Sequence, residues 1–388
     1  MNSLRESVSF PASSYAAQGI VLGRASWTAL GIVTLLVFVS APVCSLVVSP
    51  ESPFYLSTYT MTLVGKILCY ATAAIALDLV WGYCGILSLG HSLYFALGGY
   101  MIGMYLMRSI GLDGVYHSPL PDFMVFLDWK ALPWFWHGTE HFLYALLLVV
   151  LVPGALAWVF GFFAFRSGVK GVYLSIITQA MTFAMMLLFY RNETGFGGNN
   201  GFTDFKRILG LPITATGTRT ALFLASFILL VATFLCGRFI VTSRYGRVMR
   251  AVRDNEQRLI FMGYNPVGYK LALWTFSAVI CALAGALYVP QVGIINPSDM
   301  SPGSSIEMAI WVALGGRGTL LGPVLGAFIV NAAKSYLTVA FPTFWLYFLG
   351  LLFVVIPIWL PGGVIRLLHF RAKASRPAAE PVLELTQK

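Results

Sequence analysis

The chain has 388 residues, of which 58% are hydrophobic and only 10% are charged. Soluble domains carry about 25% charged residues, so this composition excludes an ordinary soluble protein and indicates a polytopic membrane protein. The formal net charge of +10 does not indicate nucleic-acid binding. Much of the excess lies in residues 237–270 and after Arg366, which is the pattern of positive charge on the cytoplasmic side of a membrane protein.

The chain begins with a polar stretch that lacks a long apolar run before Trp27. We therefore expect no cleaved signal peptide, but a polar cytoplasmic segment over residues 1–26. A transmembrane domain is predicted over 27–362, followed by a basic, flexible cytoplasmic tail over 363–388. The five cysteines lie within or beside apolar runs and form no CxxC pair, so neither a disulfide framework nor a metal site is predicted.

A membrane-spanning helix needs about 20 mainly apolar residues. The chain contains ten candidate spans, at residues 27–48, 60–80, 85–107, 141–165, 172–190, 220–241, 269–290, 305–315, 320–340 and 344–360. The eighth is short for a full crossing and could be a half-helix. The sequence thus predicts an all-α, polytopic membrane protein with about ten transmembrane helices.

The charges in the loops predict the orientation of these spans. Acidic residues outnumber basic ones in the 108–140 loop, whereas 243–268 is rich in arginine. The positive-inside rule then places both termini and residues 243–268 in the cytoplasm, and the 108–140 and 191–219 loops in the periplasm. Six spans precede the arginine-rich segment and four follow it.

Two glycine-rich segments interrupt the helical pattern, Gly82–Tyr100 in the first half and Leu314–Val330 in the second. Interrupted spans in matching halves are typical of a transport path. Small residues at helical spacing equally favour close packing of helix backbones, which is the other interpretation of these glycines. The candidates for the path are Asp78, Ser88, Gly90, His91, Gly315 and Gly316.

Several charged or titratable groups fall within predicted spans. An ionised carboxylate at membrane depth is costly, so Asp78 either faces a partner or a wet cavity, or lies near the hydrated inner end of its span. His91 is either a hydrogen-bonded structural group or a proton carrier. Glu307, Arg317 and Lys334 could pair with one another. Lys66 is expected to reach the outer interface.

The loop after the fifth span, residues 190–210, is dense in glycine and asparagine. Such a sequence adopts positive φ at little cost and directs polar groups outward. It could contact a small polar solute or a partner protein, or be only a tight structural loop. Its candidate contact residues are Gly197, Gly198, Asn199, Asn200, Thr203 and Asp204.

Residues Ser243–Gly268 form a charged amphipathic segment that is too short and too polar to span a bilayer. The pattern predicts one helix on the cytoplasmic surface, ended by Gly263 and Pro266 and shaped for contact with another protein. The alternative is that its arginines only fix the topology. The candidate contact residues are Arg247, Arg250, Arg253, Asn255 and Gly263.

The motifs G-x-x-x-x-G-K-[ST], H-E-x-x-H and G-x-S-x-G do not occur in the sequence. The chain is therefore not itself a P-loop ATPase, and no spacing favours catalysis. We expect neither enzymatic activity nor a cofactor or metal bound by this chain.

Three stretches resemble the permease subunits of bacterial ABC importers in the branched-chain amino-acid and urea/amide family. These are GYCGILSLGHSLYFALGGYM, YGRVMRAVRDNEQRLIFMGYNPVGYK and SIEMAIWVALGGRGTLLGPVLGA. The resemblance implies a type II-like ABC importer permease fold in the bacterial inner membrane and an alternating-access mechanism. It also implies that the second stretch is the segment that contacts the ATPase.

Within this family, the loop TGFGGNNGFTDF from Thr194 to Phe205 is similar to the urea-transporter branch. The resemblance implies the second permease of a urea importer, with a homologous permease, two ATPase subunits that bind ATP and Mg²⁺, and a periplasmic binding protein as partners. One alternative is a permease for branched-chain amino acids. Another, of a different class, is an ATP-independent urea channel or an ion-coupled transporter.

Overall fold

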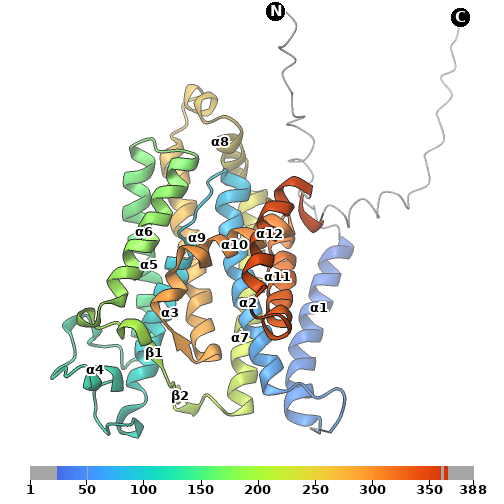
Figure 1. Cartoon of the computed structure of the whole chain (residues 1–388). Helices are drawn as coiled ribbons and strands as arrows, with labels where there is room; N and C mark the ends of the chain where they lie inside the picture. Colours follow the sequence, from blue (N-terminus) through green and yellow to red (C-terminus); the bar gives the residue numbers. More distant parts are fainter. Residues whose placement is uncertain (1–23, 50, 360–361, 366–388) are drawn as a thin grey trace, which may run out of the picture.

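The computed structural model describes residues 24–49, 51–359 and 362–365. Most of the predicted N-terminal segment 1–26 and of the predicted tail 363–388 lies outside the described residues. The rest is a bundle of helices with a small cap of loops and two-residue strands at one end (Figure 1).

A helix occupies each of the ten predicted ranges. The helices are α1 (Arg24–Pro42), α2 (Thr58–Asp78), α3 (His91–Arg108), α5 (Phe142–Arg166), α6 (Val172–Tyr190), α7 (Thr216–Thr242), α9 (Pro266–Val292), α10 (Pro302–Gly315), α11 (Leu321–Ala340) and α12 (Trp345–Trp359). Among the described residues, six are long and apolar enough to cross a membrane: α2 with its extension to Tyr83, α5, α6, α7, α9 and α11. The 14 residues of α10 extend about 21 Å, which agrees with the expectation of a short eighth segment.

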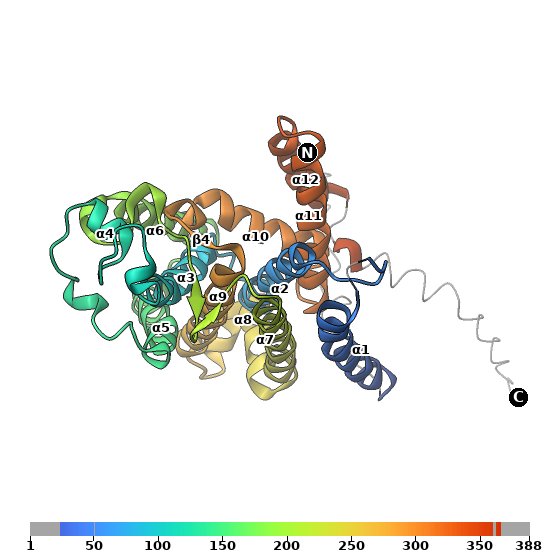
Figure 2. The same ribbon diagram turned by 90° about the horizontal axis from the view of Figure 1, so that it is seen from below.

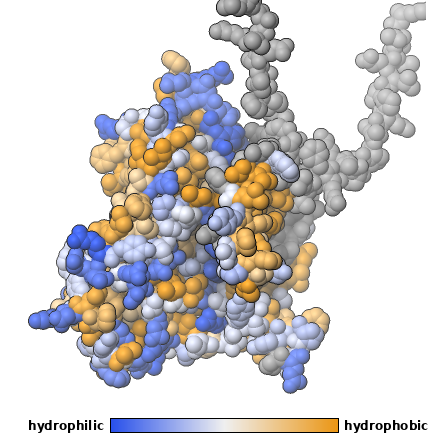
Figure 3. Space-filling model, in the orientation of Figure 1, coloured by the Kyte–Doolittle hydropathy of each residue, from blue (hydrophilic) through white to orange (hydrophobic). Residues whose placement is uncertain are grey.

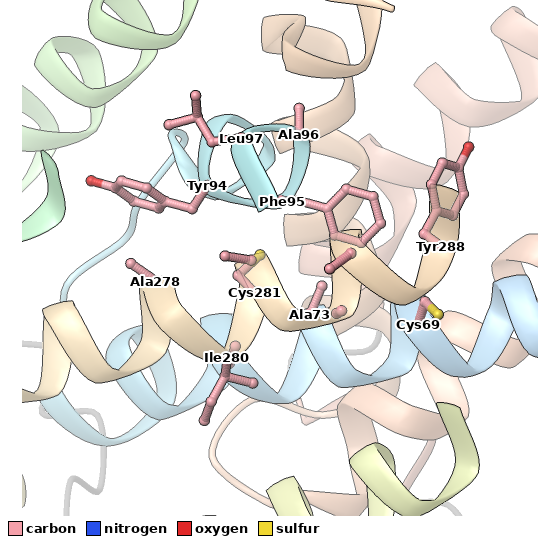
Figure 4. Packing of buried hydrophobic residues seen from close by; sticks show 14 of the residues in the cluster. Cys69, Ala73, Tyr94, Phe95, Ala96, Leu97, Ala278, Ile280, Cys281 and Tyr288 are labelled. Carbon is pink, nitrogen blue, oxygen red and sulfur yellow. The ribbon is translucent and has the colours of Figure 1, made fainter. Parts of the chain in front are cut away.

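The centre of the bundle is formed by α2, α3 and α9. All residues of α3 from His91 to Met107 are buried, and Figure 4 shows α3 crossing α9 and α2 with Phe95 and Cys281 between them. A Cβ at Gly98 would collide with the backbone of Ala282, and one at Gly285 with that of Phe95. The glycines of α3 and α9 therefore serve close helix packing.

The third predicted span, 85–107, begins too early. The end of α2 continues as a π-helix over Leu79–Tyr83, residues 85–90 are not helical, and α3 starts only at His91. The left-handed backbone of Gly85 (φ +80°) breaks the helix there.

Loops and short elements gather at the end of the bundle opposite α8 (Arg244–Phe261), as Figure 1 shows. They include α4 (Asp122–Phe126) and two antiparallel pairs, β1 (Phe202–Thr203) with β4 (Ile294–Ile295) and β2 (Arg207–Ile208) with β3 (Leu211–Pro212). The arrangement agrees with the prediction that the 108–140 and 191–219 loops lie on one side and the arginine-rich segment on the other. Figure 3 shows hydrophilic surface at the α8 end and apolar surface around the middle.

Candidate functional site

The carboxylate of Asp78 is fully buried at the end of α2. Its Oδ1 accepts the backbone N–H of Gly318 at 2.7 Å, and its Oδ2 accepts that of Leu320 at 3.4 Å. Leu320 has a positive φ of 56°, which is a strained conformation for a residue with a branched side chain. Asp78 therefore holds the turn between α10 and α11 in place.

The two glycine-rich segments meet at this turn. A Cβ at Gly82 would lie 2.6 Å from the nitrogen of Gly318, so the two backbones are in direct contact. Arg317 donates from Nε to the carbonyl of Trp81 at 3.1 Å, and its guanidinium lies 5.0 Å from the Trp81 ring centroid. Segments that are distant in sequence thus form one junction, which we call the glycine junction (residues 78–85 and 315–320).

The path candidates Gly315 and Gly316 also belong to the glycine junction, and both are in close backbone contact. A Cβ at Gly315 would collide with the carbonyl of Gly322, and Gly316 has a φ of +125°. The predicted grouping of Glu307, Arg317 and Lys334 is wrong in part. Lys334 pairs with Glu307, whereas Arg317 binds Trp81 on the other side of the turn.

The arginine-rich segment is not one continuous helix. Ser243 caps its start by accepting the N–H of Gly246 at 3.3 Å. At Asn255 the backbone leaves the helical region (φ −161°, ψ 96°), and the side chain of Asn255 accepts the N–H of Arg258 at 3.0 Å. The prediction of one helix is therefore wrong, because an asparagine that can cap a new helix stabilises a break at that position.

The end of this segment also differs in detail from the prediction. Gly263 has a left-handed φ of 85° and follows the last helical turn, as expected. Pro266, however, is the first residue of α9 rather than a stop signal, and Asn265 caps that helix by accepting the N–H of Val267. Residues 266–268 thus belong to the following helix.

The arginines of α8 fall into two groups. Arg253 points into the protein: its Nη1 donates to the carbonyl of Gly82 at 2.8 Å, and its side-chain carbons cover Gly85. Arg247 and Arg258 are exposed, and Arg250 is half-buried. Arg253 therefore connects α8 directly to the glycine junction, while Arg247 and Arg258 are part of a basic surface.

A cavity of about 340 Å³ lies beside the break in α8, between it and the connection of α5 to α6. On its wall, the carboxylate of Glu256 forms ion pairs with two lysines. The Nζ of Lys170 lies 2.8 Å from Oε2, and the Nζ of Lys270 lies 2.7 Å from Oε1. Burial acts to raise the pKa of Glu256, but the hydrogen bonds and charges of the two lysines outweigh it and lower that pKa. Sequence reasoning missed this triad, because its members are separated by 86 and 14 positions.

His91 is buried, and each of its ring nitrogens has a partner. Nδ1 lies 2.8 Å from the Ser88 hydroxyl and Nε2 lies 2.8 Å from the Ser277 hydroxyl. Ser277 donates its own proton to the carbonyl of Ala76, so it accepts from His91 and the proton resides on Nε2. Gly90 packs against Thr178. In this geometry, His91, Ser88 and Gly90 hold neighbouring helices together through hydrogen bonds and close packing.

The glycine- and asparagine-rich loop contains several residues with a left-handed backbone conformation. Gly197 and Gly198 have φ of 80° and 54°, and Asp204 has a φ of 61°. Thr203 pairs with Ile294, so much of the loop pattern is explained by local folding. Asn199 and Asn200 are exposed. They line a hollow of about 400 Å³ together with residues of the 108–140 segment, among them Tyr116, Phe123 and Phe126.

A family model matches most of the chain, over the helices from α2 to α12 and the arginine-rich segment. Residues 59–357 match the model described as the permease component of branched-chain amino acid transport systems. The chain belongs to this family, and it is a multi-pass permease of the inner membrane, a transport subunit and not an enzyme.

Several curated permeases are similar to the chain. The high-affinity branched-chain amino acid transport system permease protein LivM of Escherichia coli is 23% identical over 87% of this chain and 77% of its own length. The probable branched-chain amino acid transport permease protein LivM of Methanocaldococcus jannaschii is 24% identical over 76% and 90%. The protein BraD of Pseudomonas aeruginosa, also named for branched-chain amino acid transport, is 25% identical over 69% and 81%. No solved structure matches the chain.

Proposed function

We propose that this chain is one of two homologous permease subunits of an ATP-driven importer. Two ATPase subunits bind ATP and Mg²⁺ and contact the α8 surface, and a periplasmic binding protein delivers the solute to the opposite end. The observation that supports this proposal best is the bond from Arg253 to Gly82. A displacement of α8 by a partner would act directly on the glycine junction, and thus on the positions of α2, α10 and α11.

The solute that we propose is a branched-chain amino acid. The support is the family match over residues 59–357 and the similar permeases, which are named for branched-chain amino acid transport. This is a change from the preference for urea in the sequence analysis. The GGNNG loop favoured urea, but its glycines have local backbone reasons, so the loop says less about the solute than its composition suggests.

Urea is the second candidate, and the observation that favours it is the exposed pair Asn199–Asn200 at the rim of the 400 Å³ hollow. Amide groups suit a small neutral solute that donates and accepts hydrogen bonds. The same surface is equally suited to contact the binding protein, which would deliver either solute.

The test is uptake of radiolabelled L-leucine and of radiolabelled urea in cells that lack this chain, compared with cells in which it is restored. We expect leucine uptake to be lost and restored, with urea uptake unchanged. If urea uptake is lost and restored while leucine uptake is unchanged, the solute is urea. Purification of the restored chain without any ATPase subunit would contradict the proposal of an ATP-driven importer and favour a channel or an ion-coupled carrier.

A further inference from the structure

A second group of charges lies on predicted membrane spans, away from the glycine junction. It consists of Lys66 on α2, Glu307 on α10 and Lys334 on α11. Lys66 is eight residues after α2 begins at Thr58, which is about 12 Å along the helix axis. The Nζ of Lys334 lies 2.9 Å from both carboxylate oxygens of Glu307, so these two side chains form a complete ion pair.

Lys66 does not form such a pair. Among the described residues, no carboxylate oxygen lies within 4.0 Å of its Nζ. The carboxylates of Asp299 and Glu307 act on it only from a greater distance; Asp299 accepts the N–H of Asn296 at 3.1 Å, and Glu307 is paired with Lys334. The positive charge of Lys334 repels that of Lys66. A cation within a membrane span that has no counter-charge in contact is costly, so a group that supplies one is expected here.

Aromatic side chains lie beside this cation. The Nζ of Lys66 is 5.7 Å from the ring centroid of Tyr70 and 6.0 Å from that of Tyr288. The ring of Trp311 lies 4.8 Å from that of Tyr70. The buried Nε1–H of Trp311 has no hydrogen-bond partner in the described part of the chain. The group thus combines a cation, an unpaired donor and an apolar aromatic surface.

The group is not sealed inside the single chain. The side chain of Lys334 is 37% exposed, and Lys66 and Glu307 are half-buried. Figures 1 and 2 place α10 and α11 at one side of the bundle, next to α2. Lipid cannot solvate these charges. The surface of α2, α10 and α11 that carries these charges must therefore contact water or another subunit. The wall of a solute path between two permeases would satisfy this requirement.

We propose that Lys66 binds the carboxylate of an aliphatic amino acid on its way through the permease. The aromatic surface of Tyr70 and Tyr288 would receive the aliphatic side chain. This inference rests on the proposed function and makes it more specific. A neutral solute such as urea would leave the charge of Lys66 without a counter-ion, so the group favours a zwitterion.

The test uses the complete transporter in proteoliposomes that contain ATP: this chain, its partner permease, the ATPase subunits and the binding protein. Initial uptake of L-leucine is measured for the wild type, Lys66→Met, Lys66→Gln and Lys66→Arg. The matched control is Lys130→Met, because Lys130 is an exposed lysine of the 108–140 loop. We expect uptake to fall at least about tenfold in the two neutral variants, because the carboxylate of the solute loses its counter-charge. Lys66→Arg should retain most of the rate and Lys130→Met all of it.

The assembled complexes are compared by co-purification of the ATPase subunits, and urea uptake is measured in parallel. A neutral variant that assembles and imports leucine at the wild-type rate would overturn the inference while leaving the proposed function intact. A wild-type complex that imports no leucine would overturn the proposed solute and the inference together. A wild type that also imports urea, with both rates falling equally in Lys66→Gln, would show a structural role and overturn the inference as well.

Discussion

The carboxylate of Asp78 accepts the backbone N–H of Gly318 at 2.7 Å, which joins the end of α2 to a turn that lies 240 residues further along the chain. Four residues after Asp78, in the extension of α2, the carbonyl of Gly82 accepts a hydrogen bond from Arg253 of α8. Two hydrogen bonds thus link the arginine-rich segment to the turn between α10 and α11. We expect this route to carry the movement of α8 into the bundle.

A side chain at Gly82 should disturb this route. In Gly82→Ala the new Cβ would collide with Asp78 Oδ1 and lie 2.6 Å from the Gly318 nitrogen. We expect a loss of about 1–3 kcal/mol in stability, as for overpacking of a close contact. The measurement is the thermal midpoint of the detergent-purified protein. The control is Gly217→Ala, since Gly217 lies in α7 with open space around it. An unchanged midpoint in Gly82→Ala would contradict the close contact.

Arg253 and Arg247 should fail in different ways. Arg253→Met removes the bond to Gly82 but no exposed charge of the basic surface. We expect ATPase subunits to remain bound while uptake falls at least about tenfold, since one partly buried charge-assisted bond is worth about 1.5–3 kcal/mol. Arg247→Glu, at an exposed position, should instead weaken co-purification of the ATPase. If Arg253→Met instead lost the ATPase and Arg247→Glu kept it but lost uptake, the two proposed roles of these arginines would be refuted.

The Glu256 triad should make stability depend on acid pH. The folded state lowers the pKa of Glu256. Its contribution is therefore complete above the ordinary value of 4.5 and is lost as the pH falls through the lower folded value. We expect the thermal midpoint to decrease as the pH falls below 4.5, and less steeply in Glu256→Gln. Glu193→Gln, at an exposed carboxylate, is the control and should retain the wild-type slope.

Uptake should not depend on a proton gradient. His91 has both ring nitrogens engaged by Ser88 and Ser277, and Asp78 is engaged by backbone donors. Neither group has the free hydrogen-bonding position that a proton carrier needs. We expect a protonophore to leave the initial rate unchanged in proteoliposomes supplied with ATP. Abolition of uptake by the protonophore, at constant ATP, would support the ion-coupled alternative.

The course of the chain is largely determined by its sequence. Apolar runs of about 20 residues must be helical in a membrane, because every backbone group must be satisfied within the segment. For this reason a helix lies in each of the ten predicted ranges, and α6 has the predicted bounds of 172–190. The surplus of arginines likewise marked α8, which lies at the end of the bundle opposite the loops of 108–140 and 191–219.

The partners of the polar groups were decided only by tertiary structure. Asp78 and Gly318, Arg253 and Gly82, and His91 and Ser277 are between 171 and 240 positions apart, so local periodicity carries no information about them. The same holds for Lys66, whose Nζ lies beside the ring of Tyr288. Hydrophobicity places helices in the membrane, but the direction in which each polar side chain points depends on which helices pack together.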